Sequence, residues 1–545
     1  MSPFEFEMAA VLVEDLHDVE NVVADSVENG SDVGEDSGDE LAEPGEKRNR
    51  NAVTTKSPKH GPKTLDEKVQ KKCAATEAKN AKKLAALRLD WKPVDQKEIC
   101  FMPPALGPSD SEFAAISSKY GRFKDPQKLI TELYLDMFND TFLDAMEAEM
   151  PKTAFFFPKQ GHSNWHMLRS RQHQAIAVYF RICALQDGPK RAAPGEGGIV
   201  ANIQEARSFF EKFSGVPTVG VDILKKLLTH FLIRPQHSEL LSAIFQTFLD
   251  CLGRYVSADE KLWHFTGSNE CVRLVPSKPD QLGLWMYELC LLLEEGHPFL
   301  INFRMHDNRG GVHVTTLEIV KMWTKVLHTV GMVDDEFALE AGFRRNEKTL
   351  LAFDAYYANE ATVGWLDSQK VSYSVSCKSV NFKNLVALVL PAGYNDRSAK
   401  TGDTHSIHNT KTGHVFTHHF DTQKGVGQKF NLSGGFVSSA KQADIKKHLQ
   451  EPPCYVYYKY MFGDCDYFNT FLKRANWPHK RGGNGMEGME GAHHDYVMAS
   501  IALNLYHLFL TISHIEKKDF TMREFLLSLS EAIIVIAKKL VLLKL

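Results

Sequence analysis

The sequence predicts an α/β fold in which a helical domain precedes a core built on a sheet. Between residues 125 and 252, apolar residues recur at three- and four-residue spacing, which is the pattern of amphipathic helices. Beyond residue 255, the apolar runs 282–293 and 299–303 lack polar alternation, which indicates strands buried on both faces. At 545 residues the chain is too long for one core, so we expect several domains.

The first 95 residues are expected to form a disordered tail. Residues 1–46 carry 15 acidic side chains and no Lys or Arg, whereas residues 47–83 carry 12 Lys or Arg against 3 acids. Such charge blocks bury too little apolar surface to offset the entropy cost of ordering. The basic block is a nuclear import signal, an arm that touches DNA, or merely a solvated tail.

Composition excludes several classes of protein. Hydrophobic residues make up 43% and charged residues 24%, as in ordinary soluble globular proteins. The nine cysteines include no CxxC pair, which argues for a reducing compartment and against a thiolate zinc site. No N-terminal run has the form of a signal peptide, so none is expected, and the apolar stretch 532–545 is too short to span a membrane and is interrupted by Lys538 and Lys539. We therefore expect a soluble intracellular protein.

The helical domain is expected over residues 120–253. Residues 125–152 predict a pair of amphipathic helices with a break near Asn139, and the Gly- and Pro-rich residues 187–198 predict a loop. Three further helices are predicted at residues 203–213, 223–232 and 238–252.

An acidic pair, Asp259 and Glu260, opens the sheet region. The apolar runs 282–293 and 299–303 follow it and are joined by the turn residues 296–298, so they predict two paired strands. A carboxylate at the start of a buried hairpin is costly unless a cation or a charged substrate meets it. Asp259 is therefore a candidate site residue.

Two more acidic segments come later in the chain. Residues 350–353 predict a buried strand that ends at Asp354, and Asp464–Asp466 forms the third acidic segment. Around them we predict a helix at 315–330, a helix at 361–368, a strand at 371–377, strand-like pieces at 385–390 and 414–418, and a strongly apolar helix at 495–512.

These acidic segments, in this order, resemble the motifs of the piggyBac transposase family. The matching residues are Asp259-Glu260, Phe265-Thr266-Gly267, Lys278-Pro279, Asp354 to Asn359, and Tyr457 to Asn469. The resemblance covers about residues 125–510, and its specific motifs all lie beyond residue 255. It implies a ribonuclease-H-like transposase core with a β-rich insertion, preceded by a helical domain that binds DNA and forms dimers. The implied division is a tail at 1–95, a helical domain at 120–253, the core at 254–382 and 456–513, the insertion at 383–455, and a C-terminal helical segment at 514–545.

The resemblance also implies that Asp259, Asp354 and Asp466 are catalytic and bind Mg²⁺ or Mn²⁺. In such a core, ions held between carboxylates activate a water or a 3′-hydroxyl and stabilise the leaving oxygen. A shift of register would put Asp464 in the place of Asp466. The plainer alternative is that these are capping or surface acids in a degenerate copy.

The chain departs from the family pattern at several places. Asn469 stands where the third motif has a second Asp, and Ala355 replaces an Asn of the second motif. No cysteine follows Asp466, so the C-terminal zinc module of the family has no counterpart.

We therefore expect a nuclear, piggyBac-like transposase, or a protein derived from one, that cleaves and transfers DNA strands. Its expected partners are DNA, as transposon ends or host DNA, and a second copy in a homodimer, with no membrane and no small-molecule substrate. One alternative is a domesticated DNA- or chromatin-binding protein that keeps the fold without catalysis. Another is an unrelated metal-dependent nuclease.

Two further features predict ordinary structural roles. The histidines at 405–419 and at 493–494 fit no common zinc spacing, so loop or backbone-bonding roles are expected. The glycine-rich residues 481–485 lack the Lys and Ser or Thr that close a phosphate loop. With basic residues around them, they form either a DNA-backbone contact or a surface loop.

Overall fold

The computed structural model describes a large part of the chain. The described residues are 90–94, 116–149, 164–185, 198–214, 220–249, 255–276, 281–293, 297–306, 314–330, 338–345, 349–395, 399–421, 427–434 and 485–542, with single- or two-residue gaps inside some ranges, and Lys82, Arg88, Tyr458, Cys465, Asp466 and Phe468. The chain divides into two compact units: Met1–Leu87 with Leu274–Gln281, and Arg88–Arg273 with Leu282–Leu545. The helices and the sheet of the core belong to the second unit.

A group of helices occupies the first part of the second unit. They are α3 (Pro126–Met137), α4 (Asp140–Ala148), α5 (Asn164–Leu185), α6 (Gly198–Ser214), α7 (Val221–His230) and α8 (Ser238–Thr247), with the 3₁₀ turn η1 (Pro235–His237). Asp125 caps α3 by accepting a hydrogen bond from the Gln127 N–H at 3.0 Å. Asn139 caps α4 through the Phe142 N–H, also at 3.0 Å, so the predicted break in the helix pair is confirmed as an N-cap.

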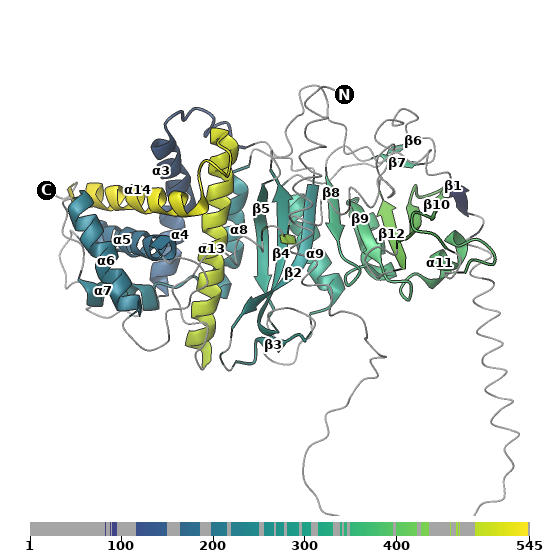
Figure 1. The fold of residues 1–545 in the computed structure, drawn as a ribbon, viewed down its shortest axis with the longest axis horizontal. Coiled ribbons are helices and arrows are strands. Elements are labelled where there is room, and N and C mark those ends of the chain that lie inside the picture. Colours follow the sequence, from purple (N-terminus) through teal and green to yellow (C-terminus); the bar gives the residue numbers. More distant parts are fainter. Residues whose placement is uncertain are drawn as a thin grey trace, which may run out of the picture. The chain divides into compact units, whose positions relative to one another are not determined.

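The C-terminal helix α14 (Met522–Leu542) packs on these N-terminal helices. The Ser170 hydroxyl of α5 donates to the Ala537 carbonyl at 2.9 Å, and the Arg181 guanidinium lies 3.3 Å from the Glu531 carboxylate. Figure 1 shows α14, in yellow, among the blue and teal helices α3, α5 and α6. The predicted C-terminal segment is therefore helical, but it completes the N-terminal helical domain instead of standing apart.

The core contains a large mixed sheet, which confirms the predicted α/β class. Its central strands are β2 (Tyr255–His264), β4 (Leu282–Leu292), β5 (Pro298–Met305), β8 (Leu350–Phe353) and β9 (Ser372–Cys377), and the short β3 (Val272–Leu274) lies between β2 and β4 in the chain. Strand β4 is antiparallel to both β2 and β5, so the two apolar runs pair as predicted. Strand β8 is parallel to β2 on one side and to β9 on the other.

Helices cover both faces of these strands. They are α9 (Thr316–Thr329), α10 (Glu360–Ser368) and α13 (Gly485–Ser513). The Asn504 side chain of α13 donates to the Leu300 carbonyl and accepts from the Leu300 N–H of β5, both at 2.9 Å. Gly488–Ser513 is long and apolar enough to cross a membrane, yet 89% of its most apolar window is buried in the fold. This burial is typical of a core helix in a packed domain.

The predicted insertion extends the same sheet beyond β9. It contains α11 (Lys383–Val389), β10 (Thr404–Asn409), β11 (Val415–Phe420) and β12 (Gln428–Gly434). A separate hairpin, β6 (Ala338–Glu340) and β7 (Phe343–Arg345), lies earlier in the chain and is not part of the insertion. Strand β12 pairs antiparallel with β9, so the sheet runs on through β11 to β10. The prediction of a strand at 385–390 is wrong, because α11 occupies it. A short apolar run does not distinguish a strand from a helix.

A strand inside the predicted tail closes the edge of the sheet. Strand β1 (Trp91–Val94) pairs antiparallel with β10, and the Trp91 side chain is only 8% exposed. The tail therefore ends before Trp91 and not at residue 95. Most of the predicted tail lies outside the described residues.

This boundary predicts different effects for two deletions. Removing residues 1–81 is expected to leave the melting temperature within about 1 °C, because β1 and its pairing with β10 remain. Removing residues 1–95 is expected to lower the melting temperature by at least about 3 °C, because a buried tryptophan and an edge strand are lost. Thermal unfolding of the two truncated chains and the full chain measures this. Equal melting temperatures for the two truncations would contradict the boundary.

Candidate active site

Two of the predicted acids lie on neighbouring strands at the same level of the sheet. The parallel register pairs Ala258 of β2 with Phe353 of β8; Asp259 is the next residue of β2, and Asp354 is the residue that follows β8. Neighbouring strands lie about 4.8 Å apart, so the two acids begin close together. The Asp259 side chain is buried, with 6% exposed, and Asp354 is partly exposed at the end of β8.

Each of these carboxylates accepts a hydrogen bond from a nearby backbone N–H. Asp259 Oδ1 accepts from Glu260 N at 2.7 Å, and Asp354 Oδ1 accepts from Tyr356 N at 2.8 Å. The second contact is the local turn that Asp commonly forms, and it ends β8. These backbone contacts therefore help to fix the position of both carboxylates.

The third motif contributes Tyr458, Cys465, Asp466 and Phe468 to the described residues. Cys465 is fully buried against β2, with its Sγ 3.3 Å from Ser257 Oγ and 3.5 Å from the Ser257 carbonyl oxygen. Ser257 precedes Asp259 by two residues, so the two side chains lie on the same face of the sheet. Asp466 follows Cys465 and is exposed. Asp464 and Asn469 lie outside the described residues.

All three predicted acids act electrostatically on one buried hydroxyl, that of Tyr458. The pKa of Tyr458 is raised well above its usual value, first by burial and then by the negative charges of Asp354, Asp259 and Asp466, with a contribution from the Cys377 thiol. Each of the three acids is thus close enough to Tyr458 to influence the pKa of its hydroxyl.

The donor set fits Mg²⁺ or Mn²⁺ in its chemistry, because both ions prefer carboxylate oxygens. Within the part of the chain that the structure describes, no group of three His, Cys, Asp or Glu side chains is arranged closely enough to hold a metal ion. The carboxylates of Asp259 and Asp354 are instead turned towards their backbone donors.

Glu260 lies on the opposite face from Asp259. The Tyr357 hydroxyl donates to Glu260 Oε2 at 2.8 Å, and Tyr287 is the register partner of Glu260 on β4. Burial, followed by the charge of Glu260, raises the pKa of Tyr357 well above its usual value. Burial also raises the pKa of Tyr287 to about 12, and its hydroxyl is hydrogen-bonded to His306 Nδ1 at 2.8 Å. Glu260 is therefore part of a buried polar network of its own.

The histidines have the structural roles expected from the sequence where the structure describes their partners. His494 Nδ1 accepts from the Ile233 N–H at 3.0 Å, and His493 Nδ1 lies 2.9 Å from the Ile233 carbonyl oxygen. In the insertion, His405 and His418 are register partners whose rings stack with centroids 5.8 Å apart.

Four buried histidines make the fold sensitive to acid. Burial lowers the pKa of His173 and His297 to about 3, that of His493 to about 4, and that of His507 well below its usual value. These side chains stay neutral in the folded protein at pH 5, whereas in the unfolded chain they take up protons below about pH 6.5. The unfolded state therefore binds more protons, and the folded state loses stability as the pH falls from about 6.5 towards 4.

We expect the free energy of unfolding to fall by up to about 1.4 kcal/mol per pH unit for each of these histidines. Urea unfolding at pH 7, 6 and 5 measures this change. The variant His328→Gln, at an exposed position of α9, is expected to show the same pH dependence as the wild type. A free energy of unfolding that is constant between pH 7 and pH 5 would contradict the burial of neutral histidines.

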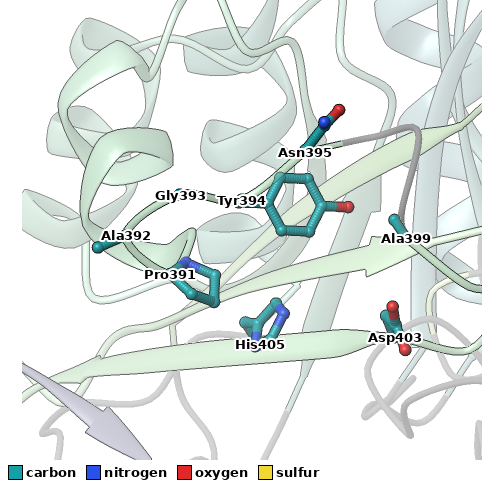
Figure 2. A pocket seen from close by; sticks show the side chains of 8 residues that line it. All are labelled: Pro391, Ala392, Gly393, Tyr394, Asn395, Ala399, Asp403 and His405. Carbon is teal, nitrogen blue, oxygen red and sulfur yellow. The ribbon is translucent and has the colours of Figure 1, made fainter.

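A cavity of about 330 Å³ lies in the insertion, away from the three acids. It is lined by Pro391, Ala392, Gly393, Tyr394, Asn395, Ala399, Asp403 and His405. Figure 2 shows the Tyr394 ring between Asn395 above and His405 below, with Asp403 to the right. The Tyr394 ring also meets His418 edge-on, with centroids 5.2 Å apart. None of the predicted catalytic acids lines this cavity.

Comparison with known proteins gives a likeness at the level of structure. No family model matches the sequence, and no curated protein matches it. Among solved structures, the chain is similar to piggyBac transposase in a synaptic complex with hairpin DNA, determined by cryo-EM, with 12% sequence identity and a TM-score of 0.49. The alignment covers 78% of this chain and 84% of that chain. A likeness at this level identifies no residue role.

Proposed function

We propose that this chain is a piggyBac-like DNA transposase, or a protein derived from one, with Asp259, Asp354 and Asp466 as its catalytic acids. The observation that carries this proposal is the parallel register that sets Asp259 beside Asp354. The action of all three acids on the Tyr458 hydroxyl supports it. The order of the three motifs in the sequence supports it independently.

The sheet topology supports a ribonuclease-H-like core as part of this proposal. Strands β2, β4 and β5 form an antiparallel meander, and β8 and β9 continue the sheet on the other side of β2, both parallel to it. The strands β10 to β12 then serve as the β-rich insertion, because they follow β9 and extend the sheet outward.

The three acids have different positions and so would serve the reaction differently. Asp259 lies within a long central strand and is buried, so its position is rigid. Asp354 lies at the end of β8 and Asp466 is exposed, so both are more accessible to DNA. A divalent ion bound to such carboxylates activates a water or a 3′-hydroxyl and stabilises the leaving oxygen. The protein would hold the scissile phosphate where these acids meet.

DNA is the proposed substrate, and a homodimer in the nucleus is the proposed working form. Binding would rest on Lys and Arg contacts to phosphates, so the affinity should fall steeply with salt. The basic block at residues 47–83 is the proposed import signal or DNA-touching arm.

The test is cleavage of duplex DNA by the full-length protein. We expect nicks that leave a 3′-hydroxyl when Mg²⁺ or Mn²⁺ is added, none with EDTA, and strand transfer when a target duplex is present. Cleavage without any strand transfer would support the unrelated nuclease instead. No cleavage with either ion would contradict a working transposase.

A second function, DNA binding without catalysis, is favoured by one observation. Asn469 stands in the third motif where the resemblance predicts a carboxylate, which removes one negative charge. The variant Asn469→Asp separates the two functions, because it should raise cleavage if the missing carboxylate limits a working site. If neither the wild type nor Asn469→Asp cuts any substrate, while both bind DNA, the protein is a domesticated binder.

A further inference from the structure

An exposed aromatic residue, Tyr356, lies beside the candidate acid Asp354. Tyr356 is 50% exposed, although its ring is large and apolar. It follows Asp354 by two residues, in the turn where Asp354 Oδ1 accepts from Tyr356 N at 2.8 Å. Its ring meets the ring of the buried Tyr357 at an angle of 89°, with centroids 5.1 Å apart. The Tyr356 ring is therefore supported from inside the fold, while about half of the residue is open to solvent.

Arg304 of β5 belongs to the same surface as the Tyr356 ring. Arg304 is exposed and is the register partner of Tyr287, which is itself the register partner of Glu260. These three side chains therefore share one face of the sheet, where Tyr357 bonds Glu260. Burial is the main cause that raises the pKa of Tyr287; among the smaller influences, Tyr356 raises it and Arg304 lowers it. Both groups therefore lie within electrostatic range of the same hydroxyl.

The start of helix α9 lies next to both residues. Asn359, the N-cap of α10 three residues after Tyr356, donates through Nδ2 to Thr316 Oγ1 of α9 at 3.3 Å. In the first turn of α9, hydrogen bonds within the capping box lower the pKa of Glu318, and the charge of Arg304 lowers it further. The first turn of α9 is thus close to Arg304 and to the segment that carries Tyr356.

An exposed ring near a guanidinium suits an unpaired nucleotide. A base stacks on an aromatic ring, and a guanidinium binds a phosphate oxygen through charge-assisted hydrogen bonds. Contacts to the backbone of a duplex use basic side chains and need no exposed ring. Two residues of chain span at most about 7 Å, so a nucleotide stacked on Tyr356 would lie next to Asp354.

We propose that Tyr356 and Arg304 form a contact site for an unpaired nucleotide of a DNA strand, in which the base stacks on the Tyr356 ring and a phosphate binds the Arg304 guanidinium. This inference rests on the proposed function, because that function makes DNA the substrate and Asp354 a catalytic acid. Tyr356 and Arg304 are binding residues that hold the strand at the site. The contact tolerates any sequence, because every base has a face that can stack.

Photo-crosslinking to the full-length protein tests the role of Tyr356. The probe is a single DNA strand of about 20 nucleotides with one iodouracil, a base that crosslinks on irradiation to a ring stacked on it. EDTA is present, so that no strand is cut. Mass spectrometry is expected to find the crosslink at Tyr356. The variant Tyr356→Ala is expected to lower the yield at least about tenfold, whereas Tyr356→Phe keeps the ring and is expected to stay within about twofold.

The salt dependence of binding tests the role of Arg304. Fluorescence anisotropy gives the Kd of the same single strand at several salt concentrations. The variant Arg304→Gln is expected to lower the slope of log Kd against log salt by about 0.7, the value for one lost phosphate contact on a single strand. The control Lys539→Gln removes one charge from an exposed position of α14 and is expected to leave the slope unchanged. An unchanged slope in Arg304→Gln excludes Arg304 from the site.

The outcomes separate this inference from the proposed function. If Tyr356→Ala crosslinks like the wild type, or if iodouracil paired inside a duplex crosslinks to Tyr356 equally well, the inference is wrong while DNA remains the substrate. If Tyr356 crosslinks but the wild type cuts no DNA with Mg²⁺ or Mn²⁺, the contact site is supported and the protein is a binder. If the wild type binds neither the single strand nor a duplex, both proposals are wrong.

Discussion

Replacing Asp354 by Asn is expected to reduce DNA cleavage at least about 1000-fold, because in the proposed function an ion worth several kcal/mol of transition-state stabilisation loses a charged ligand. DNA affinity is expected to stay within about twofold, since it depends on contacts between basic side chains and phosphates. Cleavage of a labelled duplex and its binding at several salt concentrations measure the two effects separately.

Glu260→Gln is the matched control for Asp354→Asn. Glu260 lies on the opposite face and bonds Tyr357, and glutamine still accepts that hydrogen bond. We expect this variant to cleave within about threefold of the wild type, because a change remote from the ions removes no transition-state contact. Wild-type cleavage by Asp354→Asn would remove Asp354 from the site. Equal losses in both variants would point to a general effect on the sheet.

The largest expected effect on stability comes from Gly283→Ala. Gly283 pairs with His264 across β2 and β4, and an added Cβ would lie 2.2 Å from the Trp263 carbonyl oxygen and 2.7 Å from its carbon. The backbone of a central strand does not move aside without disturbing the pairing, so we expect a loss of about 3 kcal/mol or more. Urea unfolding measures this loss.

The control for Gly283→Ala is another glycine with no close neighbours. Gly364 lies on the exposed side of α10, and nothing is within 4 Å of an added Cβ. Alanine is the better helix former, so Gly364→Ala should stabilise the protein by about 0.5–1 kcal/mol. A Gly283→Ala variant as stable as the wild type would mean that β2 and β4 do not pair in this register.

Much of the fold is predictable from sequence because local signals mark it. Asn139 caps α4 at the predicted break, and α9 begins where a helix was predicted, with a capping box formed by Thr315 and Glu318. The two apolar runs form β4 and β5, as predicted. Helix α5 was not predicted, because it is buried almost all round and shows no single apolar stripe. Some of its polar residues are bonded to each other, as when the Arg169 guanidinium donates to Gln172 Oε1 at 2.8 Å.

The candidate site is less visible in the sequence than the fold is. Asp259 is marked by its place within a buried strand, and Asp354 by its place directly after one. Asp466 is indicated only by the order of the three acidic motifs in the sequence. The sequence carries no such signal that Asp259 lies beside Asp354. Only the pairing of β2 with β8 shows it, and such register depends on contacts distant in sequence.

The packing of α14 on α5 has a consequence for synthesis on the ribosome. Ser170 and Ala537, which are hydrogen-bonded to each other, are 367 residues apart in the chain. At the usual rate of protein synthesis, about 5–20 residues per second, α14 is synthesised roughly 20–70 s after α5. During that interval the α5 surface that later receives α14 has no native partner. The nascent chain is therefore a natural client for chaperones until its last helix has left the ribosome.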